Sequence, residues 1–248
     1  MSLTAKLMLS PVLVAQAIST RARLPRLPEP DGRRQGAVGR GRPLRLLITG
    51  DSSAAGVGVQ RQQDALAPRL AQALAPLVGA RVLWQLCARS GLTTAQTLEL
   101  LRDEGHAPAD LVVVCTGVND VVDQVPSHRA VAAREALANW LRNGRGVQHV
   151  VFAPLPPVHH FPGLPQPLRW VAGADARRHN TALTAWAATR GDVSCVEMEM
   201  PLNRGVMASD GFHPGEPVYR YCANTIAQHI ATHVWPHLRP HPTPDNAS

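Results

Sequence analysis

The sequence has little with which to build a covalent cross-link or a metal site. Its 248 residues include only four cysteines, which are scattered with no C-x-x-C pair. Most of them lie in apolar segments, where a free thiol behaves as a small hydrophobic side chain. His229 and His233 stand at positions i and i+4, but no glutamate follows the first of them as in a zinc protease motif. We therefore predict no disulfide, no metal ion and no cofactor.

Lysine is also nearly absent, because Lys6 is the only one and arginine carries almost all of the positive charge. The formal net charge of +7 is unevenly distributed. Residues 1–45 contain nine Lys/Arg and two Asp/Glu, whereas residues 46–248 contain sixteen of each. The sequence therefore combines a basic leader with a neutral body, and it lacks the basic face that would predict nucleic acid as a partner.

No apolar run is long enough to span a bilayer, since residues 7–18 are interrupted by Ser10, Pro11 and Gln16. Three interpretations of residues 1–40 stay open: a peripheral tether to anionic membranes, a helix docked on the domain's own surface, and a cleaved signal peptide. The signal peptide fits least well, because arginines on the downstream side of an apolar stretch oppose export. We expect a cytoplasmic protein that can contact a membrane surface through residues 1–40, and we leave its oligomeric state open.

The remaining composition is that of one soluble globular domain. The chain is 45% apolar and 17% charged, and it is long enough to bury a sizeable core. We predict that residues 1–43 are a leader and linker, with residues 25–43 rich in proline, glycine and arginine. Residues 44–236 are predicted to form the domain, and the polar, proline-rich residues 237–248 a flexible tail.

Apolar runs alternate with amphipathic stretches throughout this domain. Strands are predicted at about 44–49, 80–86, 111–115, 147–152 and 193–198. The first helix is predicted to start at an Asp64 cap, with Leu66, Leu70, Leu74 and Leu77 on one face. The second is predicted at 94–104 with Thr93 or Thr94 as its cap, and the third at 127–142, where Asn143-Gly144 ends it. Two more helices are predicted at 168–190 and 217–234. The proline-rich stretch 154–167 is predicted to be a long ordered loop. This alternation predicts an α/β fold with a parallel sheet and helices on both of its faces.

The first predicted strand ends abruptly in Gly50-Asp51-Ser52. A serine just past the carboxyl end of a strand lies where open α/β sheets place their ligands. Taken alone, Gly-Asp-Ser is also ordinary turn chemistry, because glycine supplies an unusual φ and aspartate bonds its own backbone. We interpret Ser52 as a nucleophile because of the motifs that follow it.

Three further motifs lie at the carboxyl ends of later strands or in the last strand-to-helix loop. Gly91 follows the second strand, where a glycine exposes its backbone N–H. Asn119, within Gly-Val-Asn-Asp after the third strand, can donate its side-chain amide to an oxyanion. Asp210 and His213 are three residues apart, so that the carboxylate can fix one imidazole nitrogen and leave the other as a base. Each motif alone is common in loops.

In the order Ser, Gly, Asn, then Asp-x-x-His, these motifs resemble those of the SGNH/GDSL hydrolase family of esterases and lipases, and the resemblance covers about residues 44–234. It implies a flavodoxin-like, three-layer α/β/α fold with five parallel strands in the order 2-1-3-4-5. It also implies that Ser52 attacks the acyl carbonyl, His213 transfers the proton and Asp210 orients the imidazolium. The backbone N–H groups of Ser52 and Gly91 and the side chain of Asn119 would bind the oxyanion.

The predicted function is that of a serine ester hydrolase acting on small to medium acyl esters through an acyl-enzyme. A carbohydrate O-deacetylase and a catalytically silent binding module are the alternatives, and the complete set of signature residues argues against the second. Phe161, Leu164 and Trp170, with Leu168, are predicted to contact the acyl or alcohol group; the alternative is that they only fix their loop to the core. Ser53 departs from the leucine that many relatives carry after the nucleophile, and we assign it no role.

Overall fold

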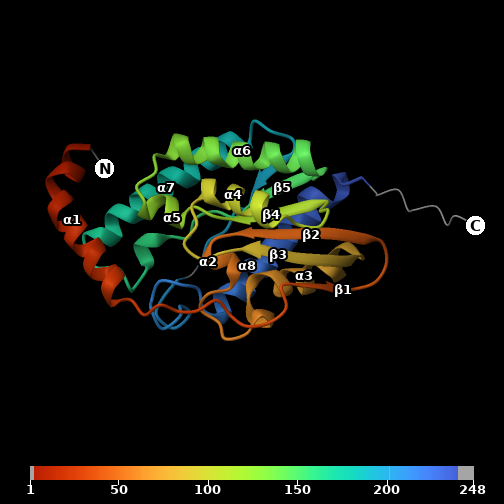
Figure 1. Cartoon of the computed structure of the whole chain (residues 1–248), viewed down its shortest axis with the longest axis horizontal. Coiled ribbons are helices and arrows are strands. Elements are labelled where there is room, and N and C mark those ends of the chain that lie inside the picture. The colour runs from red at the N-terminus through yellow and green to blue at the C-terminus, as the bar shows by residue number, and fades with distance from the viewer. Residues whose placement is uncertain (1–2, 201, 240–248) are drawn as a thin grey trace, which may run out of the picture.

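The structure is a computed structural model that describes residues 3–200 and 202–239. Figure 1 shows a central sheet between two layers of helices, with α1 set apart at one end. The strands are β1 (Gln35–Val38), β2 (Pro43–Gly50), β3 (Arg81–Ala88), β4 (Leu111–Cys115), β5 (His149–Phe152) and β6 (Val193–Cys195). The α-helices are α1 (Leu3–Arg23), α2 (Ser52–Ala55), α3 (Leu66–Val78), α4 (Thr94–Glu104), α5 (Val118–Val122), α6 (Ser127–Arg145), α7 (Leu168–Ala187) and α8 (Glu216–His229).

The sheet has the order β1-β3-β2-β4-β5-β6, and the five strands from β2 to β6 run parallel. The predicted three-layer fold and the 2-1-3-4-5 order of the parallel strands are confirmed. The prediction of five strands and of a plain linker at 25–43 is wrong, because β1 adds an antiparallel edge strand against β3. This strand has the sequence Gln-Gly-Ala-Val and lies mostly exposed, so it lacks the apolar run that marks the others.

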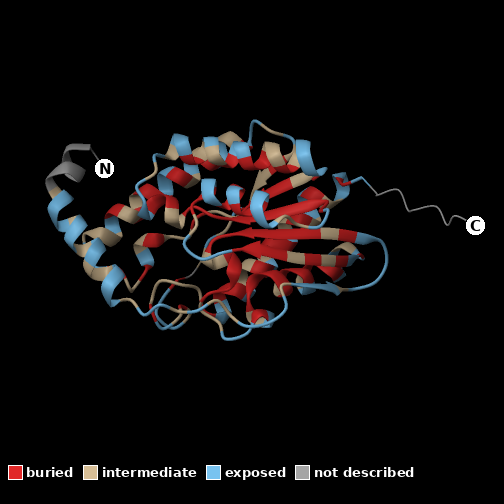
Figure 2. Cartoon of the chain, in the orientation of Figure 1, coloured by how far each residue is buried: buried red, intermediate tan, exposed pale blue. Residues whose placement is uncertain are grey.

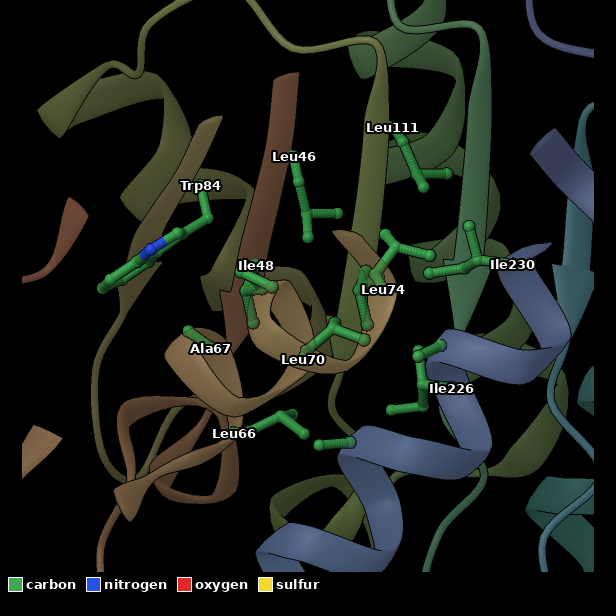
Figure 3. Close-up of a cluster of buried hydrophobic side chains, with 14 of the residues drawn as sticks. Leu46, Ile48, Leu66, Ala67, Leu70, Leu74, Trp84, Leu111, Ile226 and Ile230 are labelled. Atoms are coloured by element: carbon green, nitrogen blue, oxygen red, sulfur yellow. The ribbon is translucent and has the colours of Figure 1, made fainter. Parts of the chain in front are cut away.

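Alternate residues of β2 face the two helical layers. Leu46 and Ile48 point into the cluster formed with α3 and α8, which Figure 3 shows, whereas Leu47 belongs to the cluster beneath α4, α6 and α7. All three side chains are fully buried. The sheet is therefore covered on both faces, which explains why its central strands are continuous apolar runs.

Several helix ends differ from the predicted positions. Asp64 lies in a single 3-10 turn (Gln62–Asp64), so Ala65 is the N-cap of α3 instead. At the other end of α3, Leu77 is 49% exposed and does not share the buried face of the helix. Helix α6 continues past Gly144 and ends where Gly146 adopts a left-handed φ of 69°. The prediction for α4 is confirmed, because Thr93 caps it in a reciprocal pair with Gln96.

The C-terminal third is more irregular than the sequence pattern predicts. Strand β6 ends at Cys195, and α7 ends at Ala187. Helix α8 passes into a π-helical turn (Ile230–Val234) and a 3-10 turn (Trp235–His237) that contains Pro236. The stretch 154–167 is a loop except for one 3-10 turn, Val158–His160. Most of the predicted tail, residues 240–248, lies outside the described residues.

Candidate active site

The turn from β2 into α2 places Ser52 at the first position of a helix. Gly50 has a φ of 146°, and a Cβ there would lie 2.0 Å from the carbonyl oxygen of Cys115, so only glycine fits. The Asp51 side chain then caps α2 by accepting the N–H of Ser53 at 2.9 Å. These contacts end the strand and direct Ser52, which is only partly buried, toward the end of the sheet at which α2 begins (Figure 1).

His213 bridges Ser52 and Asp210. Its Nε2 lies 3.0 Å from Ser52 Oγ, and its Nδ1 lies 2.5 Å from Asp210 Oδ2. The other carboxylate oxygen of Asp210 accepts the backbone N–H groups of Phe212 and His213, both at 2.9 Å, so the turn is fixed by the same side chain that contacts the imidazole. The turn also requires Gly211, whose φ is 62°.

Two buried carboxylates near His213 have opposite pKa shifts. Burial raises the pKa of Asp51 to about 7, more than its hydrogen bond from the Ser53 N–H and the charge of His213 lower it. For Asp210, burial also acts to raise the pKa, but hydrogen bonds from the His213 side chain and from the backbone outweigh it and hold the pKa below its ordinary value. At neutral pH Asp210 is therefore the charged partner of the imidazole.

Gly91 lies in the loop after β3 and Asn119 in the short helix α5, and one hydrogen bond joins these two segments. The Asn119 Nδ2 donates to the carbonyl oxygen of Leu92 at 3.0 Å, and an amide has a second N–H that remains for a ligand. Gly91 has a left-handed φ of 84°. The backbone N–H groups of Ser52 and Gly91 have no hydrogen-bond partner among residues 3–200 and 202–239. Each of the three groups predicted to bind the oxyanion therefore has an N–H that no described residue occupies.

Buried polar groups fix the position of α5, the short helix that contains Asn119. The carboxylate of Asp120, which is 2% exposed, accepts the Thr94 N–H at 3.0 Å and the Thr94 hydroxyl at 2.6 Å. Arg134 is fully buried with its Nη2 3.8 Å from Asp120 Oδ2, and burial lowers the pKa of its guanidinium. Gly117 is required here, since a Cβ would lie 2.6 Å from Arg134 Nη2.

The loop of Gly91 is held by residues of the N-terminal segment that was predicted to be a linker. The Oε1 atom of Glu29 accepts the Ser90 N–H at 2.7 Å and the Ser90 hydroxyl at 2.8 Å. The Oε2 atom of Glu29 accepts from Arg34 at 2.6 Å, and Arg34 also donates to the carbonyl oxygen of Ala88. No local sequence signal marks Glu29, because Ser90, whose loop it holds, lies 61 positions further along the chain.

An apolar pocket of about 790 Å³, its open mouth included, extends from Ser52 and His213 toward α8. Its apolar lining residues include Met198, Met200, Leu202, Met207, Val218, Cys222 and Ile226. Phe161 lines this pocket as well, and its ring meets that of Phe212 edge-on at 5.2 Å. The methionines follow β6 in the sequence, and no sequence signal assigned them to a pocket.

Leu164 and Trp170 are not among the described residues that line this pocket, which corrects the prediction for them. Leu164 is buried and borders a groove between α1 and residues 162–165. Trp170 is 47% exposed in the first turn of α7. Leu168 instead packs against the cluster that contains Phe161.

Four other histidines that the sequence draws attention to, His159, His160, His229 and His233, do not line the pocket. His159 and His160 form the 3-10 turn of the proline-rich loop and do not line the pocket. The rings of His229 and His233 are 5.2 Å apart, and His229 Nε2 lies 2.9 Å from Ser194 Oγ. Within the part of the chain that the structure describes, no group of three or more metal-ligating side chains occurs.

Comparison with known proteins points to one family. The model of the GDSL-like Lipase/Acylhydrolase family matches residues 48–221, and no curated protein sequence matches the chain. A solved structure of the lipase Lip_vut3 from a goat rumen metagenome is 17% identical, with a TM-score of 0.61, and the match covers 77% of this chain and 98% of that one.

Two further solved structures have the same fold. A lipolytic protein of the G-D-S-L family from Veillonella parvula is 14% identical with a TM-score of 0.58, covering 76% of this chain and 99% of that one. A family 3 carbohydrate esterase from Clostridium thermocellum is 17% identical with a TM-score of 0.58, covering 76% and 96%. At these identities the likeness establishes the fold alone.

Proposed function

The chain belongs to the GDSL-like lipase/acylhydrolase family, and from this premise we propose that it is a serine hydrolase of small to medium acyl esters. The observation that supports the proposal most directly is the placement of His213, with Nε2 3.0 Å from Ser52 Oγ and Nδ1 on the charged Asp210. A serine becomes a nucleophile when such a base takes its proton and a third group orients the base.

In the first half of the reaction, Ser52 Oγ attacks the acyl carbonyl while His213 Nε2 takes the hydroxyl proton. The resulting oxyanion receives hydrogen bonds from the N–H groups of Ser52 and Gly91 and from Nδ2 of Asn119. The intermediate then collapses to an acyl-enzyme, and the imidazolium gives its proton to the departing alcohol. Asp210 stabilises that imidazolium and keeps its ring oriented.

In the second half, a water molecule takes the place of the alcohol. His213 removes a proton from the water, the hydroxide attacks the acyl-enzyme, and the same three donors bind the second oxyanion. Ser52 Oγ leaves with the proton that His213 returns, which restores the starting state. No step requires a group other than those of this chain, the ester and water.

The pocket supports an acyl group larger than acetyl. Its lining includes methionines, Cys222 and Ile226, which favour burial of methylene groups over recognition of hydroxyls. This lining favours a carboxylesterase over a carbohydrate O-deacetylase. A silent binding module would not need the contact between Ser52 and His213.

The test is a series of chromogenic esters from acetyl to palmitoyl, assayed with the protein and with Ser52→Ala. We expect hydrolysis with a maximum at a short or medium acyl length and none by Ser52→Ala. Hydrolysis by neither protein on any ester would reject the proposal. A strong preference for acetylated sugars over all of the series would favour the deacetylase.

A further inference from the structure

Exposed large apolar side chains gather at one end of the molecule. Among the described residues, six such side chains are exposed, and four of these lie on α1 or in the first turn of α7. They are Val12, Val14, Ile18 and Trp170, with exposed fractions from 47% to 66%. Figure 2 shows that α1 projects from the domain with much of its surface exposed. Apolar side chains exposed together in one region of a surface are typical of an interaction site.

The two faces of α1 differ in what they contact. Leu13, Gln16 and Thr20 recur at helical spacing on the partly buried face, and Gln16 exchanges hydrogen bonds with the Gln166 carbonyl oxygen (2.6 Å) and the Leu168 N–H (3.0 Å). Val14, Ile18 and Arg21 recur at i, i+4 and i+7 and are all exposed, so they lie on the opposite, outward face. The helix is therefore held to α7 on one side and unpartnered on the other.

The charge next to this outward face is positive. Arg21, Arg23 and Arg26 are exposed, and none has an ion pair or hydrogen bond with any described residue. Residues 1–45 carry the whole net charge of +7. An apolar stripe that ends in unpaired arginines is complementary to the acyl chains and phosphates of an anionic bilayer, rather than to a purely apolar partner.

This end of the molecule also carries a loop that lines the pocket. Residues 161–165 form a loop with two sides: Phe161 lines the pocket, while Pro162, Leu164 and Pro165 line the groove against α1. The same loop contacts the His213 turn, since the Gly163 N–H donates to the Gly211 carbonyl oxygen at 2.9 Å. In Figure 1, α1 lies beyond the end of the sheet at which α2 begins.

We propose that the outward face of α1, with Trp170 and the arginines that follow the helix, docks the protein on anionic lipid bilayers. No helix within the described residues is long and apolar enough to cross the membrane, so the contact is peripheral. Val14 and Ile18 enter the boundary between headgroups and acyl chains, and Arg21, Arg23 and Arg26 lie against the phosphates. Docking then brings the loop 161–165 and the pocket mouth to the lipid surface. This proposal rests on the proposed function only for that last step.

The experiment is cosedimentation of the full chain with vesicles of phosphatidylglycerol and phosphatidylcholine, and with vesicles of phosphatidylcholine alone. We expect binding to the anionic vesicles that weakens strongly when salt rises from about 0.15 M to about 1 M, where the Debye length falls to about 3 Å. Replacing Arg21, Arg23 and Arg26 by glutamine should lower the partition coefficient about fivefold per arginine. The double variant Val14→Gln/Ile18→Gln should lower it about a hundredfold, and glutamine is at least as good a helix former as valine or isoleucine.

Matched controls separate the surface from general effects. Leu77→Gln removes an exposed apolar side chain from α3, and glutamine at Arg81, Arg102 and Arg129 removes three exposed charges from the body of the domain. Both controls should bind like the parent protein. Hydrolysis of a water-soluble ester should be unchanged in all variants, which keeps a failure of docking distinct from a failure of the proposed chemistry.

Three results would overturn docking. One is a parent protein that does not bind anionic vesicles, and another is equal binding by Val14→Gln/Ile18→Gln. The third is self-association that this double variant abolishes without any vesicle binding, since the face would then contact a second copy. If the protein binds vesicles but hydrolyses no ester, docking stands and the proposed function fails.

Discussion

The two sides of Ser52 are built in different ways. On one side, Asp210 and His213 belong to a single turn that the carboxylate itself fixes through two backbone N–H groups. On the other side, Gly91 comes from the loop after β3 and Asn119 from α5, and contacts between residues remote in sequence hold them, since Asp120 binds Thr94 and Glu29 binds Ser90. The first side is local and the second depends on tertiary contacts. This difference predicts that variants of the oxyanion side will respond to changes far from the nucleophile, whereas variants of the acid–base side will not.

The largest effect is expected from the acid–base side. Ser52→Ala and His213→Ala should each lower kcat about a thousandfold or more, and the double variant should be hardly worse, because the two residues act as one unit. Asp210→Ala should be milder, since the base remains. Initial rates on a soluble ester, with melting temperatures to verify folding, measure this. If the double variant lost activity by the product of the two single losses, Ser52 and His213 would not act as one unit.

The next effect tests a donor on the other side. Asn119→Ala removes one oxyanion donor and the bond to the Leu92 carbonyl oxygen, so kcat should fall about 100-fold to 1000-fold with little change in KM. Asn143→Ala, an exposed residue of α6, is the matched control and should be unaffected. A change confined to KM would mean that Asn119 binds the substrate and not the transition state.

A shortened chain that begins at Arg40 tests the whole N-terminal segment that contacts the loop of Gly91 and the edge of the sheet. It lacks Glu29 and β1, and β1 covers Trp84 so closely that a Cβ on Gly36 would lie 2.8 Å from the indole nitrogen. We expect a loss of at least about 2 kcal/mol of stability, the order for uncovering one large apolar side chain. A chain that begins at Leu24 keeps β1 and should melt like the full chain. Equal melting of both shortened chains would show that β1 contributes nothing.

Glu29→Gln isolates the contact with the loop of Gly91. The variant weakens the hydrogen bonds to Ser90, so we expect kcat to fall about threefold to tenfold, the range of one or two net hydrogen bonds, with KM and melting temperature unchanged. Glu99→Gln on the exposed face of α4 is the control. If melting temperature falls in step with kcat, Glu29 is structural and does not position the donor.

The smallest effect concerns Asp51, which caps α2 between the two sides. Because its pKa is raised to about 7 in the folded protein, the protonated form is favoured on folding, and this contribution is lost as pH rises from about 4 through 7. Asp51→Asn keeps the cap but cannot ionise, so its melting temperature should exceed the parent's by a few degrees above pH 7 and match it near pH 4. A constant difference at every pH would exclude titration of Asp51. The pKa of Asp210 is shifted in the opposite direction. Its contribution to stability is therefore present at neutral pH and is lost as the pH falls below the ordinary pKa of an aspartate.

Local sequence patterns predict the elements of the sheet and the residues around Ser52. Buried strands are continuous apolar runs, so the five parallel strands could be located, whereas their order was implied only by the resemblance to the SGNH/GDSL family. Asp210 and His213 could be paired because three residues of one turn suffice to join them. Thr93 could be predicted as a cap because its partner Gln96 is only one helical turn away. In each case the interaction that matters lies within a few residues of the signal.

The edge strand, the contacts that hold the loops and the pocket could not be predicted in this way, because the residues that meet there are remote in sequence. Strand β1 carries no apolar pattern and exists because β3 offers an unpaired edge. Glu29 meets Ser90 across 61 positions, and Arg134 lies beneath Gly117 through the packing of α6. The pocket is lined by α8, by the segment between β6 and α8 and by the loop after β5, and within that loop Phe161 lines the pocket while Leu164, three residues on, borders the groove against α1. Such contacts follow from how elements pack, and local sequence patterns report only what an element does by itself.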